Sequence, residues 1–367
     1  MSISDSKKWL VVFFGTILML MITAVVAVVW YDPFFHYHAP RDGYKYWLQN
    51  QQSQNDGVLK HFDYDAIITG TSMTENFKTS ELDALFRVHS VKVPYVGETY
   101  SFINSQVETA LQYNPRCKMV FRCLDQDRFF QSVNARRFDQ GTYPEYLYNE
   151  NPFDDVSYIF NRDILWDYCL PAYMLHLKGE EGGHKSFDEY SNWMDEYSGE
   201  DFGAAAVLRG RSSFDPPETV RPFTEEDRET VCANITRNVT AIAEAHPEVT
   251  FYYFFPPYSV AWWGELYKNG ELERQLAAEA YVIELLLEHD NIKLYSFNTL
   301  EEVVLSLVHY KDDIHYGEWI NAQMLNYMAQ DQFLITRDND REYLAREQEQ
   351  FRSYDYNGLF NGLPPSS

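Results

Sequence analysis

The chain has 367 residues, of which 45% are hydrophobic and 17% aromatic, so it can bury the core of one sizeable domain with insertions. Its formal net charge of -25 argues against nucleic-acid binding, because a phosphate backbone is bound by clustered lysine and arginine. The same charge disfavours electrostatic adhesion to anionic lipid, so the composition suits a solvated domain held near a membrane by an anchor alone.

An uncharged apolar stretch at 9–31 supplies such an anchor. At 1.5 Å per residue, a helix of this length spans the hydrocarbon core of about 30 Å. Lys7 and Lys8 precede it, so the positive-inside rule predicts a cytoplasmic tail over 1–8 and an extracytoplasmic main domain. The competing interpretation is a cleaved signal peptide, whose apolar core is shorter, about 7–15 residues. The length of the stretch favours a retained single-pass anchor in the cell membrane.

Residues 32–60 form a connector between this anchor and the domain expected at 61–335. His36 and His38 lie two residues apart, a spacing that can hold a metal ion in a strand. No cysteine or third histidine lies close to them in the sequence, which favours a packing role instead. We therefore expect no metal and no other cofactor.

Short apolar runs alternate with amphipathic patterns through the rest of the chain. The apolar runs predict strands at 65–69, 91–96, 118–124, 249–255 and 292–296. The amphipathic patterns predict helices near 80–87, 101–113, 224–245, 272–289 and 318–330. This alternation predicts an α/β fold with a mostly parallel sheet and helices on both faces.

The stretch Gly70-Thr71-Ser72 follows the first of these predicted strands. Gly70 ends the strand, and a helical signal with a capping box begins at Ser80. A serine at a strand-to-helix turn lies where α/β sheets place ligands and nucleophiles. An ordinary polar turn explains the same stretch when it is considered in isolation.

A second segment, Asp312-Asp313-Ile314-His315, lies just before the last predicted helix of the domain. An aspartate three residues before a histidine can orient the imidazole, which then faces a nucleophile from another strand. Asp313 lies at the wrong distance from His315 for this pattern and ranks second. The two segments together predict a site made of Ser72, His315 and Asp312.

Gly-Thr-Ser after the first strand and Asp-x-x-His before the last helix together resemble the SGNH (GDSL-like) hydrolase superfamily, over residues 61–335. The resemblance implies a three-layer, flavodoxin-like fold with an inserted cap region. It also implies a catalytic triad with Ser72 as the nucleophile, His315 as the base and Asp312 as its partner. The anchor, and Gly-Thr-Ser in place of the usual Gly-Asp-Ser, look most like the envelope branch of the superfamily. That branch includes proteins of teichoic-acid D-alanylation and polysaccharide O-acetylation, which work beside membrane-bound O-acyltransferases.

The expected oxyanion hole departs from the family pattern. Gly97 matches the glycine of the family's second block by position. The third block usually reads Gly-x-Asn-Asp, and its Asn helps to bind the oxyanion, but the matching strand here ends in Asp125-Gln126-Asp127. An ionised carboxylate repels a developing oxyanion. Either Asp125 has another role, or the hole relies on the backbone N–H groups of Ser72 and Gly97.

Residues 128–222 interrupt the alternation and are rich in Tyr, Asp, Asn and Phe, which predicts a cap or substrate-side loops. Arg209 and Arg211 form a small basic spot there, which can contact an anionic polymer or a partner, although a solvated loop is the simpler interpretation.

Residues 336–367 are charged and then rich in Gly and Pro, which predicts an extension over the surface.

The four cysteines do not describe a disulfide scaffold. Cys117 and Cys123 flank one predicted strand about 20 Å apart, too far to bridge. Whether Cys169 or Cys232 pairs with one of them stays open.

Three functions fit these observations. The first is a membrane-anchored serine esterase or O-acyltransferase that acts on acyl esters of a cell-surface polysaccharide or a teichoic-acid-like polymer. The second is a non-catalytic accessory or glycan-binding protein that docks with a membrane-bound O-acyltransferase, which the altered first block and the missing Asn motivate. The third is a purely structural ectodomain. Because one triad serves both hydrolysis and acyl transfer, the sequence does not separate these two reactions.

Overall fold

The computed structural model describes residues 3–137 and 143–361. Their contacts group the chain into two compact units. Unit 1 combines Met1–Phe62 with Asp139–Ser186, and unit 2 combines Asp63–Phe138 with Phe187–Ser367. The region predicted as one insertion, 128–222, is therefore divided between the two units. Its middle part belongs with the connector, and both of its ends belong with the α/β domain.

Unit 2 is an α/β structure around a six-stranded sheet with the order β3-β2-β4-β6-β7-β8. The first five strands are parallel and β8 is antiparallel to β7, so the sheet is mixed. The strands are β2 (Ala66–Gly70), β3 (Ser90–Pro94), β4 (Met119–Cys123), β6 (Thr250–Phe255), β7 (Ile292–Ser296) and β8 (Leu334–Ile335). The predicted α/β class is confirmed, and β8 escaped prediction because two residues show no periodicity.

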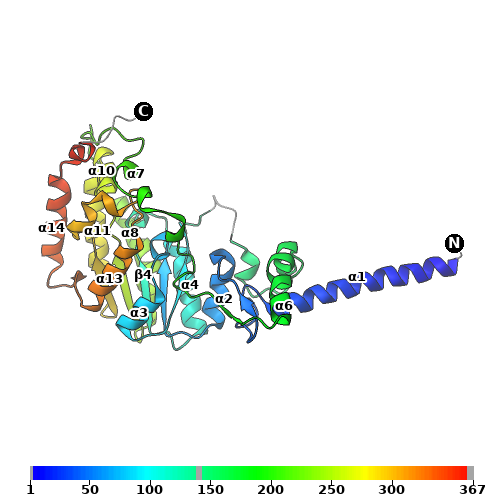
Figure 1. The fold of residues 1–367 in the computed structure, drawn as a ribbon. Coiled ribbons are helices and arrows are strands. Elements are labelled where there is room, and N and C mark those ends of the chain that lie inside the picture. Colours follow the sequence, from blue (N-terminus) through cyan, green and yellow to red (C-terminus); the bar gives the residue numbers. More distant parts are fainter. Residues whose placement is uncertain (1–2, 138–142, 362–367) are drawn as a thin grey trace. The chain divides into compact units, whose positions relative to one another are not determined.

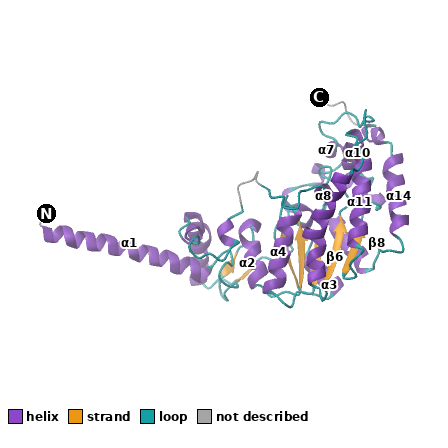
Figure 2. Cartoon of the chain, turned by 180° about the vertical axis from the view of Figure 1, so that it is seen from behind, coloured by secondary structure: helices purple, strands orange, loops and turns teal. Residues whose placement is uncertain are grey.

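Helices lie on both sides of these strands (Figure 2). In β4, Phe121 belongs to the same hydrophobic cluster as Leu82 of α3 and Met324 of α13. The next side chain, Arg122, donates hydrogen bonds to backbone carbonyls in α4 and in the π-helical segment η7. Successive strand side chains point to opposite faces, so α3 and α13 cover one face and α4 and η7 the other.

Helices α3, α4, α8–α9, α11 and α13 agree with the five predicted helical ranges, whereas α10 and α14 were not predicted. The helical segments of unit 2 are η1 (Ser72–Thr74), α3 (Thr79–Phe86), α4 (Tyr100–Tyr113), η2 (Gln126–Arg128), η5 (Met194–Glu196), η6 (Gly199–Asp201), α7 (Ala204–Val207), α8 (Glu225–Ile235), η7 (Thr236–Thr240), α9 (Ala241–Ala245), α10 (Val260–Lys268), α11 (Leu272–Leu286), α12 (Glu301–Val304), η8 (Leu307–His309), α13 (Glu318–Ala329), α14 (Asp340–Ser353) and η9 (Tyr356–Phe360).

The described part of the segment predicted as a surface extension, up to residue 361, instead contributes α14 to unit 2, at the outer edge beside α11 (Figure 1). The end of that prediction, 362–367, lies outside the described residues. Phe351 of α14 is fully buried and stacks on Trp263 with ring centroids 3.8 Å apart. The prediction of an extension rested on the charge of the segment and on its Gly- and Pro-rich end, and it overlooked the few apolar residues of this helix.

Two buried carboxyl groups meet where α14 packs on α11. Glu279 and Glu347 are both fully buried, and Tyr343 Oη lies 3.0 Å and 2.7 Å from them. Asn298 Nδ2 donates to both carboxyl groups at 2.8–3.1 Å. Burial raises the pKa of both groups, and for Glu279 the negative charge of Glu347 raises the pKa further. We infer that one carboxyl group keeps its proton and donates it to the other.

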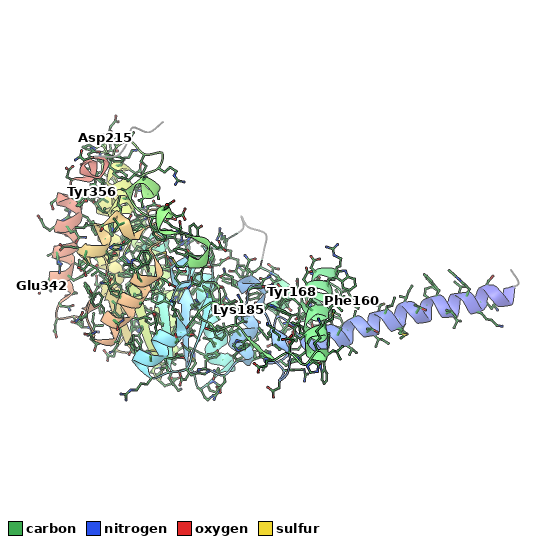
Figure 3. All side chains as sticks on the ribbon, in the orientation of Figure 1. Phe160, Tyr168, Lys185, Asp215, Glu342 and Tyr356 are labelled. Carbon is green, nitrogen blue, oxygen red and sulfur yellow. The ribbon has the colours of Figure 1, made fainter. Side chains whose placement is uncertain are left out.

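Unit 1 is built around the C-terminal end of α1 (Ile3–Tyr31). Its other elements are β1 (Lys45–Tyr46), α2 (Gln51–His61), η3 (Glu145–Leu147), α5 (Val156–Ile159), the π-helical segment η4 (Ile164–Cys169), α6 (Leu170–Leu177) and β5 (Gly183–His184). Of α1, Ser6–Tyr31 is long and apolar enough to span a membrane, and most of its apolar side chains project freely (Figure 3).

Side chains of unit 1 satisfy the last carbonyl groups of α1, which have no partner within the helix. Tyr46 Oη donates to the carbonyl of Tyr31 at 2.8 Å. One turn earlier, Tyr173 Oη adds a hydrogen bond to the carbonyl of Ala27 at 2.9 Å. His38 Nε2 and Arg41 Nε bind the carbonyls of Val29 and Trp30. The helix therefore ends inside a folded unit.

The structure gives partners to the two histidines of the connector and shows the state of the four cysteines. His36 Nε2 faces Asp155 at 3.2 Å, whereas His38 faces backbone carbonyls, so the two histidines have different partners. The four cysteines are free, and Cys117, Cys123 and Cys169 are buried.

We predict that Glu347→Gln stabilises the protein most at high pH. A carboxyl group whose pKa is raised by folding stabilises the fold below its unfolded pKa of about 4.3, and this stabilisation is lost as pH rises through the folded pKa. The gain in melting temperature of the variant in detergent should therefore be larger at about pH 8 than at about pH 5. Glu349→Gln, on the exposed side of α14, is the control and should show no such trend. A pH-independent gain for Glu347→Gln would contradict the shared proton.

Candidate active site

Ser72 lies at the carboxyl edge of the sheet, directly after β2. Gly70 has φ +148°, and a Cβ there would lie 2.8 Å from side-chain atoms of Cys123 and Thr74. A glycine is therefore required where the strand turns. Thr71 then caps η1 through its side chain, and Ser72 is the first residue of that helix. The carboxyl ends of β2 and β4 flank the point where the strand order reverses, which is where open α/β sheets bind ligands.

His315 connects Ser72 to Asp312. Ser72 Oγ lies 2.8 Å from His315 Nε2. The other ring nitrogen, Nδ1, lies 2.8 Å and 3.0 Å from the two carboxylate oxygens of Asp312. Since Nδ1 faces a carboxylate, it carries the proton, which leaves Nε2 free to accept the hydroxyl proton of Ser72.

The carboxylate of Asp312 is also held by the backbone. Its Oδ1 accepts hydrogen bonds from the N–H groups of Ile314 at 3.0 Å and His315 at 2.7 Å. Burial alone would raise the pKa of Asp312, but the hydrogen bonds from His315 and Ile314 outweigh it and hold the pKa below its usual value. The group therefore stays ionised near neutral pH and fixes the orientation of the ring.

Neighbouring residues hold the loop that carries Asp312 and His315. Ser259 Oγ donates to the carbonyl of Asp313 at 2.8 Å, and Tyr310 Oη donates to the carbonyl of Pro257 at 2.7 Å. Arg211 Nη2 pairs with the Asp313 carboxylate at 3.0 Å and Arg211 Nε with Glu265. The side chain of Asp313 is thus engaged by Arg211, while Asp312 alone faces His315.

Asp125 accepts hydrogen bonds beside the turn that carries Ser72. It is 3% exposed, and Thr71 Oγ1 lies 2.9 Å and 3.0 Å from its two carboxylate oxygens. Tyr258 Oη donates to Oδ1 at 2.8 Å. Burial and then the charge of Asp125 raise the pKa of Tyr258 well above its usual value, so this phenol remains a donor. Asp125 therefore anchors Thr71, the neighbour of Ser72, and supplies no donor for an oxyanion.

Gly97 occupies a tight turn after β3. Its φ is +68°, and a Cβ would lie 1.8 Å from Nη1 of Arg137, which itself donates to the carbonyl of Val96 at 2.7 Å. A side chain at this position would displace the guanidinium. Ser72 and Gly97 follow the carboxyl ends of the adjacent strands β2 and β3, so their N–H groups are the candidate donors to a substrate oxygen.

An aromatic wall borders His315. Trp193 meets the imidazole edge to face, with ring centroids 6.1 Å apart and an interplanar angle of 90°. The ammonium of Lys311 lies 3.8 Å from the Trp193 ring centroid and 4.0 Å from that of Tyr197. The trailing part of the predicted insertion therefore contributes directly to the surroundings of the site.

The sequence did not predict the supporting roles of Thr71, Arg211 and Trp193. Thr71 was named only as part of the Gly-Thr-Ser motif and Arg211 only as part of a basic spot, whereas the structure pairs Arg211 with Asp313 and Glu265. These roles depend on contacts with residues far away in the sequence. In the ranges 3–137 and 143–361, no group of three or more His, Cys, Asp or Glu side chains is placed to hold a metal ion.

Comparisons with protein-family models, with curated proteins and with solved structures find no match to this chain. The geometry of the site, a serine aligned with an imidazole that a carboxylate orients, is suited to nucleophilic attack on an acyl carbonyl.

We predict that Asp312→Asn slows acylation of Ser72 by an activated ester such as p-nitrophenyl acetate by roughly 10²–10⁴-fold. The amide cannot stabilise the imidazolium that forms during attack, and it favours the wrong ring tautomer. Asp313→Asn is the matched control on the same loop and should cost far less, because Asp313 faces Arg211. Equal losses in the two variants would contradict the assignment of Asp312 as the orienting group.

Proposed function

We propose that this protein is a membrane-anchored, extracytoplasmic serine esterase or O-acyltransferase of the SGNH type. The observation that carries the proposal is the distance of 2.8 Å between Ser72 Oγ and His315 Nε2, together with the Asp312 carboxylate on the other ring nitrogen. Hydrolases and acyltransferases activate a serine by this arrangement on several unrelated folds.

The strand order supports the finer fold assignment. When the five parallel strands of unit 2 are numbered along the chain, β3-β2-β4-β6-β7 becomes 2-1-3-4-5. This is the flavodoxin-like order, which the SGNH resemblance implies. Ser72 follows the first strand and His315 precedes the last long helix of the sheet region, α13, as the family pattern requires.

The proposed reaction has two half-steps. In the first, His315 Nε2 takes the proton of Ser72 Oγ while Oγ attacks the acyl carbonyl carbon. The N–H groups of Ser72 and Gly97 bind the oxyanion, and His315 returns the proton to the leaving alkoxide, which leaves an acyl-serine. In the second, a water or sugar hydroxyl gives its proton to His315 and attacks the acyl-serine, and Ser72 recovers its proton.

The anchor favours a substrate at the cell surface. A helix long enough to span a membrane precedes the catalytic unit, so the enzyme would work beside its membrane. A polysaccharide or a teichoic-acid-like polymer that carries acyl esters is the substrate class that fits, and a membrane-bound O-acyltransferase is the partner that could supply the acyl group.

A second candidate function is a non-catalytic accessory protein of such an acyltransferase. One observation favours it: Asp125 stands where the family has an Asn donor, and its carboxylate is already engaged by Thr71 and Tyr258. On this alternative Ser72 would be dispensable, and the aromatic surroundings of the site would bind glycan.

Only the enzymatic candidate forms an acyl-enzyme on Ser72. We expect the full-length protein in detergent to release p-nitrophenolate from p-nitrophenyl acetate in a burst, and mass spectrometry of the quenched protein to find the acetyl group on the Ser72 peptide. An added polyol acceptor such as glycerol should accelerate turnover and yield acetylated glycerol if transfer is the natural reaction. Without acceleration, hydrolysis is the reaction.

Ser72→Ala is the control and should show neither the burst nor the modified peptide. Absence of an acyl-enzyme in the wild type, with the protein shown to be folded by circular dichroism, would contradict the enzymatic proposal and support the accessory role.

A further inference from the structure

An apolar stripe runs along the surface of unit 1, on α6 and on the π-helical turn before it. Its members are Trp166, Leu170, Met174 and Leu177, which are 61%, 43%, 49% and 84% exposed. They are spaced four, four and three residues apart, so they share one face of the helical segment. Phe153, Val156 and Phe160, in and beside α5, are also exposed. Contiguous exposed apolar side chains of this kind mark a site of contact with a membrane or a protein.

The helix that carries the stripe packs on α1 inside its apolar span. Tyr173 Oη donates to the carbonyl of Ala27 at 2.9 Å, and the rings of Tyr173 and Tyr31 lie 6.1 Å apart. Ala27 lies four residues before the end of α1, about 6 Å along the axis. The segment η4–α6 is therefore fixed at the level of the last turn of the apolar helix.

The segment 164–177 has one side that is buried in unit 1 and one exposed side that is mostly apolar. Ile164, Cys169 and Ala172 are buried within unit 1, whereas the exposed positions of 164–177 are the four stripe residues, Asp167 and His176. Only Asp167 among these exposed residues carries a fixed charge. A nearly uncharged face with Trp166 near one end matches helices that lie in the membrane interface with their apolar side among the acyl chains.

We propose that the stripe is a second membrane contact, which inserts into the interfacial layer of the bilayer beside α1. The proposal rests on the membrane anchorage through α1 that the proposed function includes. Unit 1 is then held directly on the membrane surface. The hydrogen bond from Tyr173 to the carbonyl of Ala27 holds it there, together with the other bonds that unit 1 makes to the last turn of α1. Zwitterionic lipid is the favoured occupant, since the stripe has no basic residues to attract anionic headgroups.

The test uses the full chain in phosphatidylcholine vesicles with a single environment-sensitive fluorophore. Cys232→Ser removes the one cysteine that is not buried. In that background, Leu170→Cys and Leu177→Cys place the probe on the stripe, Val12→Cys places it within α1, and Glu349→Cys places it on the exposed side of α14. Quenching by lipid that carries a spin label near its headgroup then reports contact with the interface.

We expect the probes at 170 and 177 to be quenched several-fold more than the probe at 349, with emission shifted to shorter wavelength. If both behave like the probe at 349 while the probe at 12 is strongly quenched, the anchor stands and the second contact is overturned. If the probe at 12 also stays unquenched, the anchorage itself fails, whatever the reactivity of Ser72. The vesicles contain no other protein. A stripe that binds only a protein partner therefore leaves the probes at 170 and 177 as weakly quenched as the probe at 349, while the probe at 12 is still quenched.

Discussion

The hydrogen bond between Ser72 and His315 joins two segments that are 243 residues apart in the chain. A parallel sheet makes this possible, because the carboxyl ends of all its strands meet at one edge. Ser72 follows β2 at that edge, and the loop of His315 is held there by Ser259, which comes after β6. The catalytic proposal thus depends on the register of the sheet, since a shifted strand would carry Ser72 away from the imidazole.

Buried polar groups maintain this edge. Asp125 at the end of β4 accepts hydrogen bonds from Thr71 and Tyr258, and so links three loops at the carboxyl ends of their strands. Under the proposed SGNH assignment, Thr71 takes the place of the usual acid of the first block, and its bond to Asp125 gives that difference a physical reason. An aspartate at both positions would place two carboxylates in contact, whereas Thr71 donates to the one that is present. Thr71 and Asp125, the two residues that depart from the pattern this chain resembles, are therefore partners of each other.

The sequence predicted the α/β class, the five parallel strands and the helices α3, α4, α8–α9, α11 and α13, the strands from short apolar runs and the helices from amphipathic patterns. It also pointed to Ser72, Asp312 and His315, which the fold brings together, since two of them share a short motif and the third follows a strand. It did not predict the two-residue strand β8 or the helices α10 and α14. Nor did it reveal Arg211 and Trp193, whose partners lie far away in the sequence. Local periodicity predicts elements, whereas the partners of a polar side chain depend on the tertiary fold.

The most direct test of the account is the reactivity of Ser72 toward a fluorophosphonate, measured by intact-protein mass spectrometry on the full-length protein. The account predicts one label per chain on the Ser72 peptide of the wild type, and none in Ser72→Ala or in His315→Ala. A folded wild-type protein that takes no label, or a label that persists in Ser72→Ala, would contradict the claim that His315 activates this serine.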